Sequence, residues 1–218
     1  MERDAFLDRV RAAAAPQRVG RAHPLPPDPG PQQAWPGAGT DVVSDFEAAA
    51  RRHGASVSAA AGPEALGVLV GEVVESWGVR SAVVSCDPEV AAAAALLEDR
   101  GVKVVPWDGP GAASRADLGV TGAAYGIAAT GSVVVDAGRA GGRTASLLPP
   151  GHLAVLRIDL IVATPSDLWR EMAVRFPDGP PSQFVVVTGP SKTGDIEQVP
   201  TTGVHGPGRL HVALVSPG

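Results

Sequence analysis

The sequence predicts an α/β fold, an open and mostly parallel sheet flanked by helices, and two observations lead to this prediction. Between residues 82 and 105, an apolar strand, a helix and a second apolar strand follow one another within about 25 residues, which is typical of a right-handed parallel crossover. The candidate strands are also almost continuously apolar, as expected where helices cover both faces of a sheet.

The first 39 residues differ from the rest. Residues 2–15 read as a helix with Phe6, Leu7 and Val10 on one side, and a segment rich in proline follows, VGRAHPLPPDPGPQQAWPGAG. Closely spaced prolines exclude regular helix and favour extended chain. We therefore separate an N-terminal helix and Pro-rich arm, residues 1–39, from one globular domain, residues 40–218. The arm either reaches a partner or folds back on the domain.

From residue 40 onward, helix-capping and helix-breaking residues mark the helix ends. Gly54 stops a helix over 41–53, and a helix over 63–77 opens on Pro63 and ends at Gly78. Asp87 is placed to cap a third helix, from Pro88 to Arg100. The remaining expected elements are strands over 82–85, 102–105, 118–121, 132–136, 153–158, 160–163, 184–188 and 210–215, a helical turn over 125–129 and a helix over 166–176.

Composition narrows the class of protein. Of 218 residues, 44% are hydrophobic and 19% charged, which suits a folded domain, and the net charge of −5 argues against a nucleic-acid surface. One cysteine, Cys86, allows neither an internal disulfide nor an iron–sulfur cluster ligated by this chain alone. The sequence shows no signal peptide and no apolar run of the roughly 20 residues that span a membrane, so we expect a cytoplasmic protein.

The segment FVVVTGPSKTGDIE concentrates functional groups after a strand. Lys192 supplies positive charge, Ser191 and Thr193 supply hydroxyl donors, and glycines allow close backbone approach to an anion. Because ligands of open α/β sheets bind beyond the carboxyl ends of strands, we expect an anion site at that edge. Pro190 and the glycine-to-lysine spacing exclude a P-loop. The alternative is a Gly-Pro turn with solvated charges.

Three residues are candidates for proton transfer. Asp195 and Glu197 would share a face of an extended segment, and His205 lies between glycines in GVHGP. The competing interpretations are a Lys192–Asp195 ion pair that orders the loop and a turn histidine bonded to backbone.

Three more segments are noted. In YGIAATGS, small residues would let a ligand approach, with hydroxyls at Thr130 and Ser132, unless the segment is only a turn. His152 in SLLPPGH either faces the same cleft or caps a strand. Cys86 follows a strand end, where a thiolate could be favoured, but a buried and inert cysteine is the commoner arrangement.

Four segments in order, GVTGAAYGIAATGSVVV, SLLPPGHLAVLRIDLIV, VVVTGPSKTGDIE and GVHGPGRLHVALV, resemble the LUD-domain family, and within it the lactate utilization protein C group. The resemblance covers roughly residues 40–218. It implies a fold like that of the NagB/RpiA/CoA-transferase superfamily and a part in bacterial oxidation of L-lactate to pyruvate, beside iron–sulfur partner proteins. Ala129 stands where family members often carry an acidic residue, and Ser132 where they often carry threonine.

The sequence and the resemblance together define the expected site. Catalytic candidates are His205, Asp195 and Glu197, and no metal is expected; ligand-binding candidates are Thr130, Gly131, Ser132, Thr188, Gly189, Ser191, Lys192, Thr193 and Gly206. The preferred hypothesis is a subunit of an L-lactate oxidation system that binds a small anionic ligand, has no cofactor of its own, and leaves iron–sulfur clusters to partner subunits. The alternatives are a stand-alone enzyme acting on a phosphorylated or CoA-ester substrate, and a non-catalytic assembly or regulatory subunit.

Overall fold

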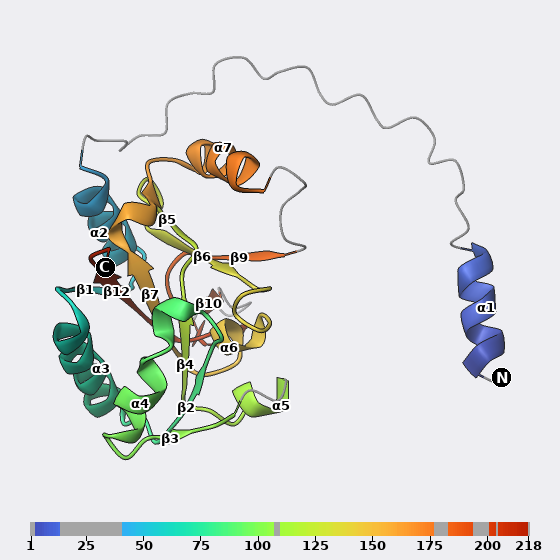
Figure 1. The fold of residues 1–218 in the computed structure, drawn as a ribbon, viewed down its shortest axis with the longest axis horizontal. Coiled ribbons are helices and arrows are strands. Elements are labelled where there is room, and N and C mark those ends of the chain that lie inside the picture. Colours follow the sequence, from blue (N-terminus) through green and yellow to red (C-terminus); the bar gives the residue numbers. More distant parts are fainter. Residues whose placement is uncertain are drawn as a thin grey trace. The chain divides into compact units, whose positions relative to one another are not determined.

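A six-stranded, wholly parallel sheet organises the domain (Figure 1). Its strands, in spatial order, are β1 (Ser56–Ala60), β12 (Arg209–Val215), β7 (Gly151–Arg157), β4 (Leu118–Gly122), β2 (Ser81–Val84) and β3 (Lys103–Val104). The computed structural model describes residues 3–13, 41–106, 110–176, 183–193, 201–203 and 205–217. Residues 1–34 and 35–218 form two separate units, and α1 (Arg3–Ala13) is the described part of the first.

A second, mixed sheet has four strands: β8 (Ile161–Val162), β5 (Tyr125–Ile127), β6 (Ser132–Asp136) and β9 (Phe184–Val187). β5 pairs with β8 in parallel, whereas β6 runs antiparallel to both β5 and β9. A short antiparallel pair joins β10 (Lys192–Thr193) to β11 (Thr201–Thr202). The predicted α/β class with a mostly parallel sheet is confirmed, but the strand predicted over 184–188 belongs to the second sheet.

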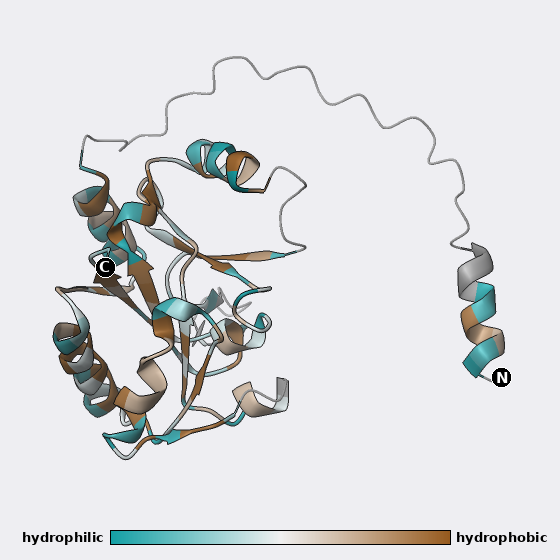
Figure 2. Ribbon diagram, viewed as in Figure 1, coloured by the Kyte–Doolittle hydropathy of each residue, from teal (hydrophilic) through white to brown (hydrophobic). Residues whose placement is uncertain are grey.

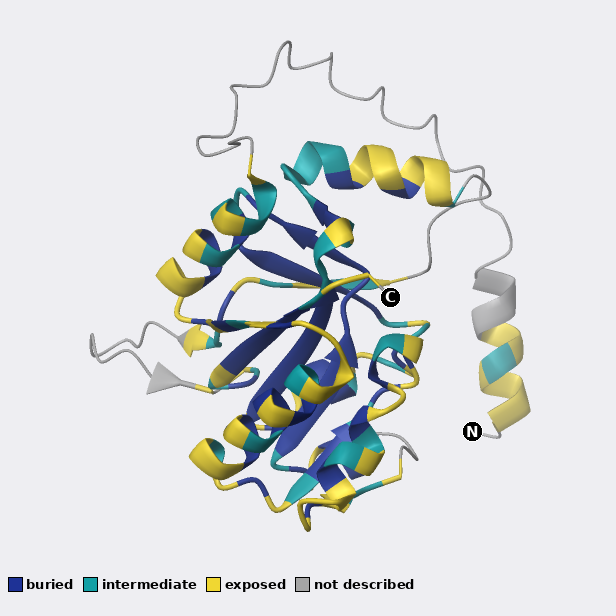
Figure 3. Cartoon of the chain, turned by 60° about the vertical axis from the view of Figure 1, so that its left-hand side comes forward, coloured by how far each residue is buried: buried dark blue, intermediate teal, exposed yellow. Residues whose placement is uncertain are grey.

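Helices cover both faces of the main sheet. They are α2 (Val42–Arg52), α3 (Pro63–Trp77), α4 (Ala93–Glu98), α5 (Pro110–Ala113) and α6 (Thr144–Leu147), with 3₁₀ turns η1 (Pro88–Val90) and η2 (Ile158–Leu160). A further helix, α7 (Pro165–Arg175), packs against β5 and β8 of the second sheet. Figure 3 shows the sheet strands buried beneath helices whose outer sides are exposed. Among the described residues, none of these helices is both long enough and apolar enough to cross a membrane.

Successive residues of the central strands point to opposite faces of the sheet and pack into two hydrophobic cores. Leu153 and Val155 of β7 pack with α3 and α4 on one face, while Ala154 and Leu156 pack with α2 and β6 on the other. Phe46 of α2 is fully buried in this second core. A third, smaller core holds α7 against β5 and β6. Figure 2 shows the same segregation, with apolar strands between helices that present polar residues outward.

Local signals explain three of the helix boundaries. The Asp41 carboxylate accepts hydrogen bonds from Val43 N and Ser44 N at the start of α2. Thr164 and Asp167 form a reciprocal capping box at α7. Gly78 ends α3 in the left-handed region, at φ 65°.

Four expectations about local structure were wrong. The helix expected over 88–100 is interrupted, and the Asp87 side chain makes no capping bond to it. The helical turn expected over 125–129 is instead strand β5, because the backbone there pairs with β6 and β8. Cys86 is exposed rather than buried. β1 was not predicted at all.

Candidate functional site

The motif segments meet at the amino edge of the main sheet. β7 and β12 are parallel neighbours that begin in register, Gly151 opposite Arg209, so the loops before both strands lie together. Gly208 N donates a hydrogen bond to Pro150 O at 3.0 Å, which joins SLLPPGH to GVHGP. The expected position at the carboxyl edge was wrong, because TGPS follows β9 of the second sheet and the chain then enters β12 at its amino end.

Backbone hydrogen bonds join the TGPS and GVHGP segments directly. Ser191 N donates to Pro207 O at 2.8 Å, and Gly203 N donates to Ser191 O at 3.0 Å. A Cβ on Gly206 would lie 3.5 Å from Ser191 Cβ, so these two predicted ligand-binding residues are neighbours. His205, between Gly203 and Gly206, is exposed.

Three predicted hydroxyl residues form a row. Ser132 Oγ lies 2.7 Å from Thr130 Oγ1 and 2.7 Å from Thr188 Oγ1, which connects the ATGS and TGPS segments. Three hydroxyls carry three hydrogens, and the two bonds within the row use only two. The third hydrogen therefore stays at one end of the row, or on the buried Ser132 when both threonines donate to it, and the exposed Thr188 is an end that a ligand can reach.

Removing the middle hydroxyl tests the row. Ser132 is 1% exposed, so Ser132→Ala leaves both threonine hydroxyls without their partner, and we expect a loss of about 1–2 kcal/mol in the free energy of unfolding. Urea denaturation measures it. Ser114→Ala is the control, since Ser114 is exposed and its hydroxyl donates to the nearby Gly111 O. Equal stability of the two variants would contradict the hydrogen bonding of Ser132 to the two threonines.

Two predicted ligand-binding glycines pack against α2 instead of open space. A Cβ on Gly131 would lie 2.1 Å from Ala50 N, and a Cβ on Gly189 would lie 2.5 Å from His53 O. Both glycines have positive φ, 62° and 77°. Close approach is therefore required at both positions, and the backbone of α2 occupies the adjacent space.

Lys192 reaches the same end of α2. Its Nζ lies 3.5 Å from His53 O, at the C-terminal cap of the helix, where a positive charge is favourable. Lys192 is exposed. Only the backbone of Thr193 is described, and Asp195 and Glu197 lie outside the described residues.

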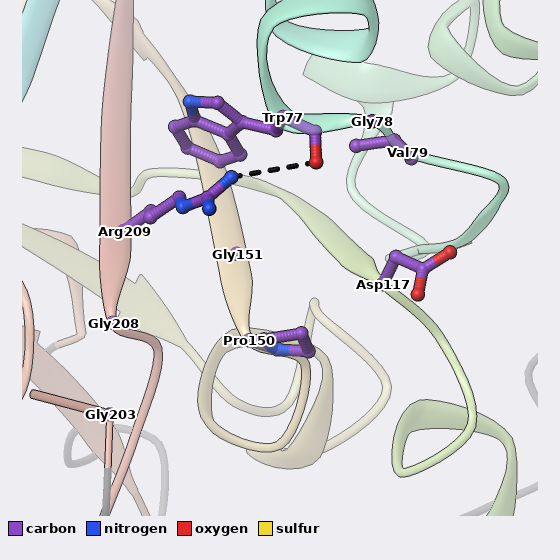
Figure 4. A pocket seen from close by; sticks show the side chains of 9 residues that line it. All are labelled: Trp77, Gly78, Val79, Asp117, Pro150, Gly151, Gly203, Gly208 and Arg209. Atoms are coloured by element: carbon purple, nitrogen blue, oxygen red, sulfur yellow. Dashed lines mark hydrogen bonds between the residues drawn. The ribbon is translucent and has the colours of Figure 1, made fainter.

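A pocket of about 360 Å³ opens beside these loops (Figure 4). Its walls come from the end of α3, the starts of β4, β7 and β12, and the GVHGP loop; the lining residues are Trp77, Gly78, Val79, Asp117, Pro150, Gly151, Gly203, Gly208 and Arg209. Sequence reasoning missed Trp77, Asp117 and Arg209. Arg209 follows GVHGPG directly, which is the one signal that could have identified it.

Among its described lining residues, the pocket carries one charge of each sign. The Arg209 guanidinium carbon lies 5.8 Å from the Trp77 ring centre, and Nη1 donates to Trp77 O at 3.4 Å. Burial raises the pKa of Asp117, but hydrogen bonds from Arg80 N and from Ser81 outweigh it, so the pKa lies below its usual value. Arg209 is thus the group in this pocket that can attract an anion.

His152 does not enter the pocket. It is fully buried in β7, and its Nε2 lies 2.9 Å from Thr121 Oγ1, while Nδ1 has no hydrogen-bond partner in the described part of the chain. Burial lowers its pKa to about 4, so the ring is neutral near pH 7. Neither expected role, cleft residue or strand cap, describes its place inside the strand.

The parallel sheet, the helices on both faces and the motif loops at one edge define an α/β protein with a loop-built site. The sequence profile of the LUD domain matches residues 43–215, and the chain belongs to this family. The predicted family is therefore confirmed.

Two relatives are named "Lactate utilization protein C". The protein from Deinococcus radiodurans is 33% identical over 202 residues, covering 89% of this chain and 88% of its own length. The protein from Halalkalibacterium halodurans is 32% identical over 156 residues, covering 67% of each. A crystal structure of a DUF162 family protein from Deinococcus radiodurans is similar with a TM-score of 0.57 and 26% identity, over 80% of this chain and 96% of that one.

Proposed function

We propose that this protein is a subunit of a bacterial system that oxidises L-lactate to pyruvate together with iron–sulfur partner proteins. The observation that carries the proposal is the similarity to two proteins named "Lactate utilization protein C", one of which aligns with 89% of this chain. The four motif segments of the chain also lie within the region that matches the LUD domain.

Electron balance supports partner subunits. Oxidation of lactate to pyruvate removes two electrons and two protons, so an acceptor is required. The chain has one cysteine, whereas a cluster held by protein thiolates needs about four, and it has no Rossmann glycine fingerprint. In the proposal, the electrons therefore pass to clusters on partner proteins.

The proposed ligand of the motif loops is a small anion. Support comes from the bonds that join these loops, from the exposed Thr188 hydroxyl, and from the Arg209 guanidinium in the adjacent pocket. His205, with Asp195 or Glu197, remains the proposed group for proton transfer. The glycines Gly131 and Gly189 contribute by fixing these loops against α2.

Gene deletion and complementation test the proposal. We expect deletion to abolish growth on L-lactate but not on pyruvate, and the wild-type gene to restore it. Arg209→Gln should restore growth poorly, since it removes the pocket's cation, while Arg170→Gln on the exposed side of α7 should restore it fully. Affinity purification from the same cells should yield a complex with the visible absorbance of iron–sulfur clusters.

Two outcomes would contradict different parts of the proposal. Normal growth of the deletion strain on L-lactate as the only carbon source, with no iron in the purified material, would rule out the lactate system. Full complementation by Arg209→Gln would instead rule out the pocket as the anion site and leave the assignment to lactate oxidation standing.

A further inference from the structure

The opposite, carboxyl edge of the main sheet contains a topological switch point. From β2 the chain moves outward to β3, whereas from β4 it moves the other way, to β7 and then to β12. In open α/β sheets, the crevice beyond the carboxyl ends of the strands at such a point is where ligands bind. The motif loops, which were expected at a carboxyl edge, lie at the other edge of this sheet.

A buried carboxylate lies at the switch point. Asp87 follows β2, is 4% exposed, and accepts hydrogen bonds from Ser85 Oγ and from Gly122 N at the end of β4. Burial raises the pKa of Asp87, against these two hydrogen bonds and the charge of Arg139. Its side chain therefore joins the ends of the two strands that flank the crevice.

A series of alternating charges continues from Asp87 across the strand ends. The Arg139 Nε lies 4.0 Å from Asp87 Oδ1, and its Nη2 donates to both Glu89 oxygens at 3.0 and 3.1 Å. Arg157, at the end of β7, donates from Nε and Nη2 to Asp159 at 3.0 and 2.6 Å. Two guanidinium groups and three carboxylates thus lie along one edge of the sheet.

A pocket of about 300 Å³ lies within this series. It is lined by Pro88, Glu89, Arg157, Val215 and Ser216, so it covers the ends of β7 and β12 and the segment that follows β2. Glu89 and Arg157 therefore face one cavity from different elements. Hydrogen bonding to Asp159, together with the charges of Asp159 and Glu89, raises the pKa of Arg157.

The two charged groups have different binding chemistry. A guanidinium has five N–H donors, of which Asp159 takes two in this structure, and its planar fork suits a carboxylate. An ionised Glu89 only accepts hydrogen bonds, so a ligand must bring a donor to it. The volume is at the lower end of small-molecule pockets, so the cavity has room for a small organic acid.

We propose that this carboxyl-edge pocket binds a small carboxylic acid that also carries a hydroxyl group, the carboxylate on Arg157 and the hydroxyl on Glu89. The ligand class follows from the pocket and does not depend on the proposed function. Only the choice of L-lactate as the first probe rests on that function.

Isothermal titration calorimetry of the purified full-length protein at pH 7 tests the proposal, with L-lactate and glycolate as probes and propanoate as the matched acid without a hydroxyl. We expect at least one hydroxy acid to bind about tenfold or more tightly than propanoate. Arg157→Gln should weaken that binding by about 10- to 100-fold. Arg170→Gln should leave it unchanged.

A second variant guards against loss of folding in Arg157→Gln. Ser216 is exposed at the pocket wall, and Ser216→Trp should fill the cavity without changing any charge and abolish binding. Thermal unfolding confirms that each variant folds. Binding of neither hydroxy acid, or equal binding by wild type and both pocket variants, would overturn the proposal. Binding of glycolate without L-lactate would support the pocket and count against lactate as its ligand.

Discussion

Lowering the pH from 7 to 4.5 is expected to reduce the free energy of unfolding by about 2 kcal/mol through His152 alone. Burial lowers the pKa of this histidine from 6.5 to about 4 in the folded protein. Its charged form cannot be solvated there, and Nδ1 has no hydrogen-bond partner among the described residues. The unfolded chain, in contrast, exposes the ring to water and accepts a proton near the usual pKa.

Stability falls, and does not rise, on acidification because the pKa of His152 is lower in the folded protein than in the unfolded chain. Between about pH 6.5 and pH 4 the unfolded chain binds more protons than the folded one, so stability falls as the pH falls through this window. The contribution of His152 to the free energy of unfolding is constant above about pH 6.5 and is fully lost below about pH 4. Burial also lowers the pKa of His211, against the charge of Glu72, which adds to the effect in the same direction.

Urea unfolding at several pH values, on wild type and His152→Gln, measures this contribution. Glutamine cannot take up the proton, and carboxylates contribute equally to both proteins, so the difference between the two curves isolates His152. The variant should be less stable at pH 7, because the bond to Thr121 is altered, and should lose less stability on acidification. Parallel curves would mean that His152 is accessible to protons in the folded state.

Gly131→Ala is expected to lower the free energy of unfolding by at least about 3 kcal/mol, a large part of the stability of a typical domain. The added Cβ would lie 2.1 Å from Ala50 N and 2.5 Å from the carbonyl carbon of Ala49, both in the backbone of α2. A helix backbone cannot move aside as a side chain can. A further cost of about 1–2 kcal/mol arises because φ is 62°.

Gly67→Ala is the matched control. Gly67 is also a buried glycine, but its Cβ would lie 3.4 Å from Leu96 Cδ2, an ordinary contact, and it sits inside α3. Alanine there should be neutral or stabilising by up to about 1 kcal/mol. Chemical denaturation of both variants gives the comparison. A stable Gly131→Ala protein that no longer supports lactate growth would show that Gly131 contacts a ligand rather than holding α2.

The regular parts of the fold follow from local signals. Apolar periodicity and the residues at helix ends predicted α2, α3 and α7, and the spacing of two apolar runs predicted the parallel pairing of β2 with β3. β5 was predicted as a helical turn, although Tyr125 and Ile127 favour strands, because a three-residue strand carries little local signal and its pairing with β6 and β8 decides its conformation. β1 is similar, since SVSAA is a strand through its pairing with β12.

The sequence predicted which residues belong to the candidate site better than it predicted the edge of the sheet at which they lie. The sequence identified Thr130, Ser132 and Thr188, and the structure joins their hydroxyls. It could not show which sheet receives β9, so the edge at which TGPS meets GVHGP was assigned to the wrong end. Asp87 was assigned a capping role because it precedes Pro88, whereas two of its actual partners, Gly122 and Arg139, are 35 or more positions away along the chain.

The place of β12 between β1 and β7 has a consequence for synthesis of the chain on the ribosome. Among the described strands, β1 pairs only with β12, and the 148 residues 61–208 separate the two. β1 therefore emerges long before its only neighbour is translated, and at about 5–20 residues per second it waits roughly 7–30 s. Its backbone is an open template during that interval, so chaperone binding should matter most for nascent chains shorter than about 215 residues.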